Sequence, residues 1–137
     1  MIMAPSRTVE SAVRPRVLLV DDNAAMLTRA AAALQATCTI VGTAMNGRGA
    51  LEAAHTLHPD VIVLDISMPD MNGLEVAARL RGSGSTAAVV FLTVHEEDEF
   101  LDVARAAGGL GYVIKPRLTT DLAVAVRETS AGRRYGI

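Results

Sequence analysis

The chain has 137 residues, of which 50% are hydrophobic, and a formal net charge of −2. This length supports one domain with its own core, and the slightly acidic balance lacks the basic character typical of nucleic-acid-binding domains. The single cysteine, Cys38, excludes an internal disulfide and favours a reducing compartment, so we expect a cytoplasmic protein.

Residues 1–15 lack the long apolar run of a signal peptide or membrane anchor, so we predict a flexible leader. The apolar run 17–20 predicts a short buried strand that ends in the acids Asp21 and Asp22. A helix is predicted next, with Asn23 as its cap. Its apolar residues recur at helical spacing: Leu27, Ala30, Ala31 and Leu34.

A weaker strand over 39–42 and a helix over 50–57 follow, and Pro59 ends the helix. The strand 61–64 reads Val-Ile-Val-Leu, which is apolar at every position and indicates burial on both faces of a sheet. It ends at Asp65. The turn-forming sequence of 68–73, Met-Pro-Asp-Met-Asn-Gly, predicts a loop that holds its shape around this carboxylate.

The remainder of the chain repeats the same alternation. A helix over 74–80 precedes the strand 89–92, and an amphipathic helix over 97–107 precedes the strand 112–114. The last helix, for which Thr120 is the expected cap, ends before residue 132. Strand and helix thus alternate along the whole chain, which predicts an α/β fold with a doubly wound parallel sheet and helices on both faces.

Polar residues with chemical uses follow four of the predicted strands. They are Asp21 with Asp22, Asp65, Thr93 and Lys115. Because the carboxyl ends of parallel strands share one edge, these side chains should meet in one cleft. Two carboxylates about 4 Å apart repel by about 4 kcal/mol at an effective dielectric of 20, so positive charge is needed there. Lys115 supplies one charge, and Mg²⁺, which prefers carboxylate oxygens, is the natural second.

Such a site contains the parts needed for phosphoryl transfer, in which a carboxylate can itself accept the phosphoryl group. Plainer interpretations of single residues stay open. The Asp21-Asp22 pair alone fits a solvated turn, Asp65 or Thr93 alone fits a helix cap, and Lys115 alone fits a surface charge. Their shared position at strand ends favours the site.

Four segments, taken in order, resemble the receiver domain of two-component response regulators. The segments are Val-Asp-Asp-Asn at 20–23, Leu-Asp-Ile-Ser-Met-Pro-Asp-Met-Asn-Gly at 64–73, Leu-Thr at 92–93 and Tyr-Val-Ile-Lys-Pro at 112–116. The resemblance implies a receiver domain over 16–131, with 132–137 as a tail or the start of a linker. It also implies a flavodoxin-like (CheY-like) fold with strand order 2-1-3-4-5. The run 131–135 is similar to the entry into a linker in LuxR or NarL regulators, which carry a helix-turn-helix domain.

The resemblance also implies roles for the acidic residues. Asp65 would accept the phosphoryl group from a histidine kinase. Asp22, Asp65 and the backbone carbonyl of Ser67 would bind Mg²⁺, for which Mn²⁺ could substitute, and Asp21 would act mainly through water.

Further roles follow for the hydroxyl, the ammonium and the aromatic residue. Lys115 would pair with the phosphoryl group, and Thr93 would hydrogen-bond to it after moving inward. Tyr112 would change rotamer behind Thr93 as a switch, although an ordinary strand aromatic is the plainer interpretation. The Lys115–Pro116 peptide bond would be cis, a form that only a bond preceding proline adopts cheaply.

Three residues near the expected site leave the lifetime of the phosphorylated form open. Val94 is bulkier than the small residue often found after this threonine in the family. His95 and Ser67 flank the place where water would attack.

The implied function is a phosphorylation-gated module that is not an enzyme beyond its own phosphoryl transfer and autodephosphorylation. Its partners would be a sensor histidine kinase or phosphotransfer protein, and an output domain or partner at the face made by helix 97–107, strand 112–114 and helix 122–129. A homodimer is compatible with this pattern, and we expect neither direct nucleic-acid binding nor membrane binding.

Two alternatives remain. One is a stand-alone phosphorelay receiver without a DNA-binding output. The other is a small Mg²⁺-dependent phosphatase with an aspartyl nucleophile, which would need a second acid two residues after Asp21, where Asn23 stands.

Overall fold

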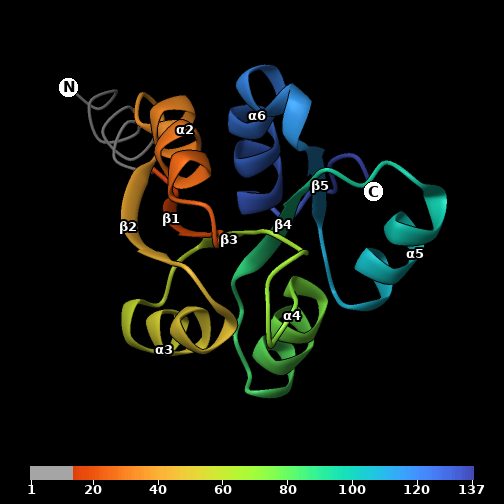
Figure 1. Ribbon diagram of the computed structural model, residues 1–137. Coiled ribbons are helices and arrows are strands. Elements are labelled where there is room, and N and C mark those ends of the chain that lie inside the picture. Colours follow the sequence, from red (N-terminus) through yellow and green to blue (C-terminus); the bar gives the residue numbers. More distant parts are fainter. Residues whose placement is uncertain (1–13) are drawn as a thin grey trace.

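A five-stranded parallel sheet in the order β2-β1-β3-β4-β5 forms the centre of the molecule (Figure 1). The computed structural model describes residues 14–137, so residues 1–13 of the expected leader lie outside it. The strands are β1 (Arg16–Val20), β2 (Thr39–Ala44), β3 (Val61–Leu64), β4 (Ala88–Thr93) and β5 (Gly111–Ile114). The helices are α2 (Ala24–Leu34), α3 (Gly47–Leu57), α4 (Gly73–Gly82), α5 (Asp98–Ala106) and α6 (Leu118–Ser130), with the 3₁₀ turn η1 (Lys115–Arg117) before α6.

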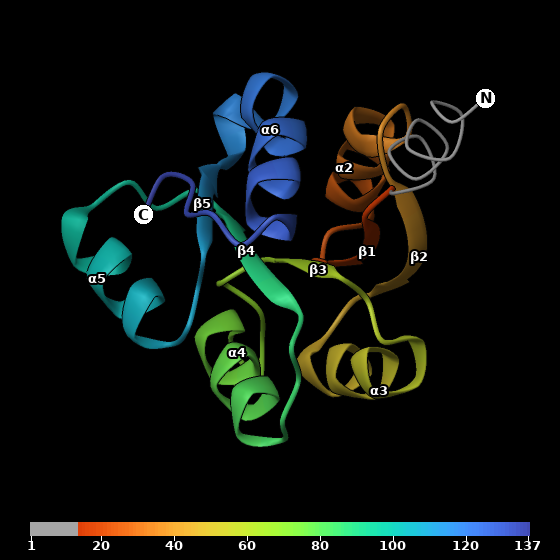
Figure 2. The same cartoon turned by 180° about the vertical axis from the view of Figure 1, so that it is seen from behind.

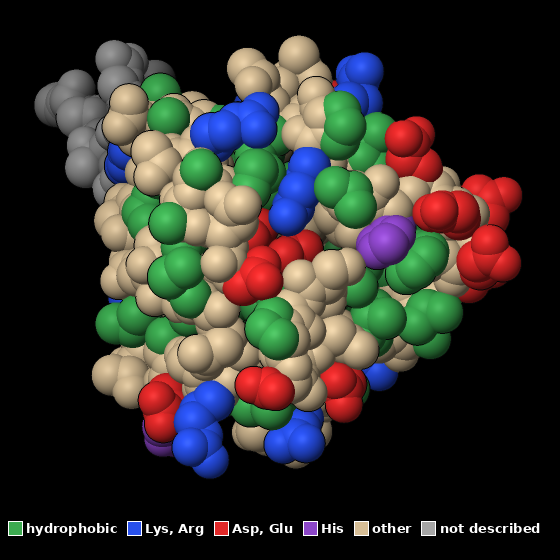
Figure 3. Space-filling view, viewed as in Figure 1, with side chains coloured by type: hydrophobic (Ala, Val, Ile, Leu, Met, Phe, Trp, Pro, Cys, Tyr) green, Lys and Arg blue, Asp and Glu red, His purple; other side chains and the backbone are tan. Residues whose placement is uncertain are grey.

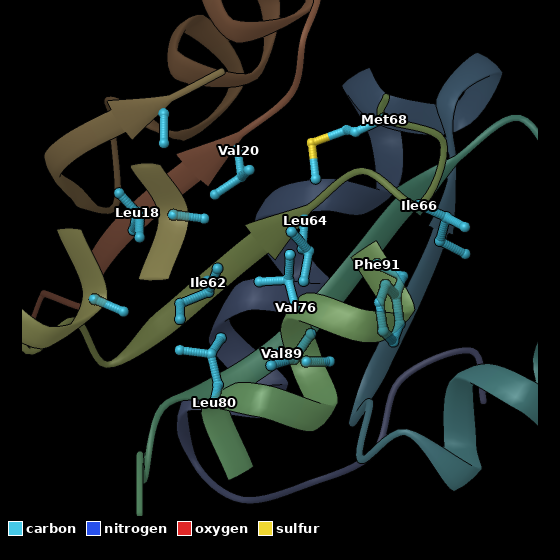
Figure 4. Packing of buried hydrophobic residues seen from close by; sticks show 14 of the residues in the cluster. Leu18, Val20, Ile62, Leu64, Ile66, Met68, Val76, Leu80, Val89 and Phe91 are labelled. Carbon is cyan, nitrogen blue, oxygen red and sulfur yellow. The ribbon is translucent and has the colours of Figure 1, made fainter. Parts of the chain in front are cut away.

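The side chains of β3 show why helices cover both faces of the sheet. Val61 and Val63 belong to one core cluster, which also holds buried residues of α2 and α6. Ile62 and Leu64 belong to the other cluster, with buried residues of α3, α4 and α5 (Figure 4). Because successive strand residues point to opposite faces, a four-residue apolar strand needs cover on both sides. The predicted doubly wound fold and its strand order are confirmed.

The register of the sheet brings the ends of four strands to one edge. Val20 pairs with Leu64, and Leu64 pairs with Phe91 in β4. Thr93, the last residue of β4, pairs with Ile114, the last residue of β5. The residues directly after β1, β3 and β5 therefore emerge side by side, which is the condition for a shared site.

A side-chain cap marks the start of α2 but not that of α6. Asn23 caps α2, as predicted, because its side chain accepts a hydrogen bond from the Met26 amide at 3.1 Å. The prediction of Thr120 as the cap of the last helix is wrong, since α6 begins at Leu118 and continues directly from η1. The Thr120 hydroxyl lies within the first turn and donates to the Arg117 carbonyl.

The expected cis bond between Lys115 and Pro116 is not observed, because no peptide bond in residues 14–137 is cis. Pro116 lies in the first turn of η1, where the Leu118 amide closes the turn onto the Lys115 carbonyl. Proline suits the first positions of a helix because its fixed φ matches the helix. An N–H at these positions would have no acceptor within the helix, so its absence costs nothing. The trans form is therefore the one that leads into α6.

Within the described part of the chain, no helix has the length and apolar character needed to cross a membrane.

Candidate functional site

The three acids predicted to meet do so at the carboxyl edge of the sheet. Carboxylate oxygens of Asp21, Asp22 and Asp65 all lie within 4.8 Å of one another. Asp21 and Asp65 are buried, each 3% exposed, whereas Asp22 is exposed. Figure 3 shows acidic side chains in a hollow near the middle of this face, with a Lys or Arg side chain beside them. The three carboxylates therefore line a hollow, and solvent reaches it on the side of Asp22.

Lys115 supplies the positive charge expected at this edge. Its Nζ lies 3.0 Å from Asp21 Oδ2 and 3.4 Å from Asp65 Oδ1, and all three side chains are largely buried. The contact between Lys115 Nζ and Asp21 Oδ2 is an ion pair by its distance but does not have the geometry of a hydrogen bond. Asp21 Oδ2 therefore has no hydrogen-bond partner among the described residues. This carboxylate oxygen is thus buried and incompletely satisfied, and it belongs to the acidic cluster.

The loop after Asp65 is held in place by its own backbone. Ser67 N–H donates to Asp65 Oδ1 at 3.3 Å, and Gly73 N–H donates to the Ile66 carbonyl at 2.8 Å. A Cβ on Gly73 would overlap the Asp65 carbonyl oxygen, so only glycine allows α4 to begin this close to the strand end. At the start of α4, Asn72 and Glu75 form a capping box. The predicted rigid loop is therefore present.

Burial, and after it the neighbouring charge of Asp21, together raise the pKa of Asp65 from 3.8 to about 6. The ammonium of Lys115 and the Ser67 amide act in the opposite direction. The carboxyl is therefore harder to ionise than a surface aspartate, yet it is mostly ionised at neutral pH.

This pKa predicts a pH dependence of stability. Because the folded-state pKa lies above the unfolded value of 3.8, the protonated carboxyl stabilises the fold fully below pH 3.8, and this is lost as pH rises through about 6. In metal-free buffer we expect the free energy of unfolding to fall by about 1–2 kcal/mol across this window, after allowance for the partial solvation of the cluster.

Urea unfolding at several pH values measures this slope. Asp65→Asn should remove it because asparagine does not titrate, whereas Glu52→Gln, at an exposed position outside the site, should keep it. A slope that survives in Asp65→Asn would show that another group titrates.

Thr93 and Tyr112 lie close to the site and share a neighbour, His95. Thr93 is completely buried, and its Oγ1 accepts a hydrogen bond from the His95 amide at 3.2 Å. The Tyr112 hydroxyl donates to the His95 carbonyl at 2.8 Å. Burial and the nearby charge of Glu97 raise the pKa of Tyr112 to about 12, so the phenol keeps the proton that it donates. Tyr112 as a residue is 6% exposed and is therefore more deeply buried than an ordinary half-buried strand aromatic.

A contact across the mouth of the site was not anticipated from the sequence. Ser67 Oγ lies 3.1 Å from His95 Nε2, so the loop after β3 touches the loop after β4. The His95 ring also stacks on Phe100 of α5, with the centroids 4.0 Å apart. Both residues are expected beside the site from the sequence, but their contact was not predicted, because they are 28 positions apart in different loops. The capping box, by contrast, is visible in the spacing of Asn72 and Glu75.

The residues present fit a divalent cation. The cluster offers carboxylate oxygens from Asp21, Asp22 and Asp65, and Asp21 Oδ2 is the buried oxygen without a hydrogen-bond partner. Hard cations such as Mg²⁺ prefer oxygen ligands of this kind. The chemistry of the carboxylate donors and the buried Asp21 Oδ2 without a hydrogen-bond partner both match such an ion.

A hollow of about 770 Å³ lies at the opposite end of α3 and α4 and contains none of the clustered acids. Its lining mixes His55, His58 and Arg79 with Asp60 and apolar side chains. It lies where α3 and α4 end, a place where exposed carbonyls disfavour anions. The convergent charges at the other edge make the acidic cluster the stronger candidate.

Comparisons with known proteins agree with this geometry. The sequence profile of the response regulator receiver domain family matches residues 17–127. The chain is 35% identical over 118 residues to the nitrate/nitrite response regulator protein NarL of Escherichia coli K12, covering 85% of this chain and 55% of NarL. It is 39% identical over 121 residues to the positive alginate biosynthesis regulatory protein of Pseudomonas aeruginosa, covering 86% of this chain and 48% of that protein.

Two solved structures are similar throughout. The signal receiver domain of the NarL response regulator from Mycobacterium tuberculosis superposes with a TM-score of 0.84 at 31% identity, covering 88% of this chain and 98% of that one. A LuxR-family response regulator from Aurantimonas superposes with a TM-score of 0.85 at 27% identity, covering 89% of each chain. The chain spans about half the length of the curated relatives it matches.

Proposed function

Because this chain belongs to the response regulator receiver domain family of two-component systems, we propose that Asp65 accepts a phosphoryl group from a histidine kinase or phosphotransfer protein. Receiver domains work with histidine kinases and output domains. The observation that carries the assignment is the convergence of three carboxylates within 4.8 Å beside the Lys115 ammonium. Asp65 stands at the end of the central strand, with one oxygen near Lys115 and the Ser67 amide.

The proposed transfer follows from these contacts. An ionised Asp65 oxygen attacks phosphorus, forming a new O–P bond while the bond from phosphorus to the donor's nitrogen or oxygen breaks. Lys115 moves from pairing with carboxylates to pairing with the phosphoryl oxygens, and the Thr93 hydroxyl donates to one of them. Two such charge-assisted hydrogen bonds, about 1.5–3 kcal/mol each, are comparable with the about 5.5 kcal/mol needed to invert a strongly biased two-state equilibrium.

Receiver domains generally bind Mg²⁺ at an acidic pocket, and we propose that Asp22, Asp65 and the Ser67 carbonyl hold it here, with Asp21 contributing mainly through water. When bound, the ion supplies positive charge for the oxygens of the incoming group. The protein residues then orient the acceptor carboxylate and hold the phosphoryl group. We propose no reaction for the chain beyond this transfer and its own dephosphorylation.

Incubation with a small-molecule phosphodonor and Mg²⁺ tests the proposal. We expect one phosphate per chain, labile to hydroxylamine as an acyl phosphate should be, and mapped by mass spectrometry to the peptide that contains Asp65. Omission of Mg²⁺ should abolish labelling. A phosphate on a histidine or a serine, or none at all, would contradict the assignment.

Magnesium binding is tested separately by thermal unfolding. Mg²⁺ should raise the melting temperature in proportion to the logarithm of its concentration above the dissociation constant. Asp22→Asn should weaken the apparent affinity by about 10-fold or more, because it removes a charged oxygen ligand. The control Asp70→Asn lies in the same loop and keeps a residue type that tolerates its positive φ of 69°. If Asp22→Asn responds to Mg²⁺ like Asp70→Asn, Asp22 is not a ligand.

The proposed output is a change in the face made by α5, β5 and α6. The curated relatives NarL and the alginate regulator are about twice as long as their matched region. We therefore propose that this receiver controls an output domain, with transcription as the readout, and that it works in the cytoplasm. A stand-alone phosphorelay receiver is the second candidate. An affinity difference for a candidate output domain between phosphorylated and unphosphorylated chain separates the two.

A further inference from the structure

The last residues of the chain lie along the edge of the sheet and pair with it at one isolated bridge. We call residues 133–137 the strap. Tyr135 N–H donates to the Leu110 carbonyl at 3.0 Å, and Tyr112 N–H donates to the Tyr135 carbonyl at 2.9 Å. These bonds make Tyr135 a parallel bridge partner of Gly111 on β5. Figure 2 shows the C-terminal end of the chain beside β5. The strap therefore pairs with part of an edge strand that would otherwise present free backbone groups.

The strap is anchored at its start and wraps around the sheet edge. The Arg133 guanidinium forms two hydrogen bonds with the Glu128 carboxylate, at 2.8 and 3.1 Å, and the Arg133 amide donates to the Glu128 carbonyl. Tyr135 packs against the core cluster beneath α2 and α6, whereas Ile137 packs against the cluster on the opposite face. Gly136, at φ 71°, turns the chain between them.

Gly136 makes the strap sensitive to substitution. A Cβ at this position would overlap the Tyr112 carbonyl oxygen, and the positive φ disfavours any other residue. The strap therefore fits closely against Tyr112. Its backbone also accepts a hydrogen bond there, from the Tyr112 amide to the Tyr135 carbonyl.

Tyr112 joins the strap to the acidic site. Its hydroxyl bonds to the His95 carbonyl, and the His95 amide bonds to Thr93 Oγ1. Its amide bonds to Tyr135 in the strap. A continuous series of hydrogen bonds therefore runs from the hydroxyl at the end of β4 to the strap. The acidic site and the strap can influence each other only if the residues that link them have two conformations. An experiment that detects a change at the strap when the acidic site is occupied would show this.

We propose that the strap is a regulatory cover of the β5 edge whose docking is weakened when a phosphoryl group occupies Asp65. This inference rests on the proposed function. When Thr93 turns toward the phosphoryl oxygens, the His95 amide loses its acceptor and the His95 backbone is no longer held in place. The His95 carbonyl, which accepts the hydrogen bond from the Tyr112 hydroxyl, can then move. The strand that holds the strap then loosens, and the β5 edge between α5 and α6 opens for an output partner.

Amide hydrogen exchange at Tyr112 and Tyr135, followed by NMR, tests the coupling. The chain is compared alone and with Mg²⁺ and beryllium fluoride, a stable analogue of a carboxyl-bound phosphoryl group. We expect exchange at both amides to become about fivefold faster or more with the analogue, the lower range of measured coupling between sites. Unchanged or slower exchange, in a chain shown to bind the analogue, overturns the strap proposal and leaves the proposed function intact.

The reciprocal experiment uses variants of the strap. Gly136→Ala should release the strap and, because coupling is reciprocal, should bind beryllium fluoride about fivefold more tightly. Arg133→Gln, which loses the bonds to the Glu128 carboxylate, should shift affinity in the same direction. Arg134→Gln is the matched control, since the exposed Arg134 makes no hydrogen bond or ion pair within residues 14–137. Equal affinity in Gly136→Ala and Arg134→Gln overturns the proposal, and absence of binding by the unmodified chain overturns the proposed function with it.

Discussion

Asp65→Asn should lower phosphoryl labelling by about 100-fold or more while leaving the fold intact. Removal of a covalent nucleophile eliminates the reaction itself rather than weakening a contact, which is why the effect exceeds that of any neighbouring substitution. Asparagine preserves the size of the side chain and one carbonyl oxygen, so the contact with the Ser67 amide can persist. Labelling is measured as the fraction of chain carrying phosphate at fixed time, phosphodonor and Mg²⁺.

The control for this experiment is Asp102→Asn, an acid on α5 whose side chain is 75% exposed. It should label as the unmodified chain does. Labelling of Asp65→Asn at the control level would remove Asp65 from the role of acceptor, and mass spectrometry would then identify whether Asp21 or Asp22 carries the phosphate.

Phe91→Ala should destabilise the domain by about 3–5 kcal/mol, a large share of the about 5–15 kcal/mol that holds a domain folded. Phe91 is completely buried in β4 between its strand partners Leu64 and Tyr112. The Phe91 ring lies so close to Gly109 that a Cβ on residue 109 would collide with it, which shows how tightly the core is packed around this ring. Truncation would leave a cavity that the surrounding strands cannot close.

Urea unfolding measures the change as a shift of the midpoint at constant slope. Phe100→Ala on α5 is the matched control, since the same ring is only partly buried there and should contribute less. Equal losses in the two variants would show that burial does not decide the contribution of these rings.

The core and the site differ in how far they follow from local patterns. The run Val61–Leu64 indicates a doubly covered strand because every position is apolar, and the alternation of strands and helices then restricts the topology to a parallel sheet. Once the strands are parallel, the residues that follow them must share an edge. Asp21, Asp65 and Lys115 could therefore be predicted to meet from their positions alone.

Other features depend on contacts that the sequence does not encode locally. Thr120 has the composition of a cap, but α6 begins earlier because the turn containing Pro116 continues directly into it. The same turn accounts for the trans Lys115–Pro116 bond. The Ser67–His95 contact requires two loops to meet.

By itself, the sequence determined the class of fold, the strand ends that carry the acids, hydroxyl and ammonium, and the Asn23 cap, because hydrophobic period, chain direction and short-range hydrogen bonding are local properties. Only the tertiary structure decided how the site is closed and where the end of the chain lies. The family resemblance implied that residues 132–137 are a tail or the start of a linker, yet residues 133–137 dock because the edge of β5 and the Glu128 carboxylate are placed to receive them. Such docking depends on surfaces assembled from distant segments, and no local pattern reports them.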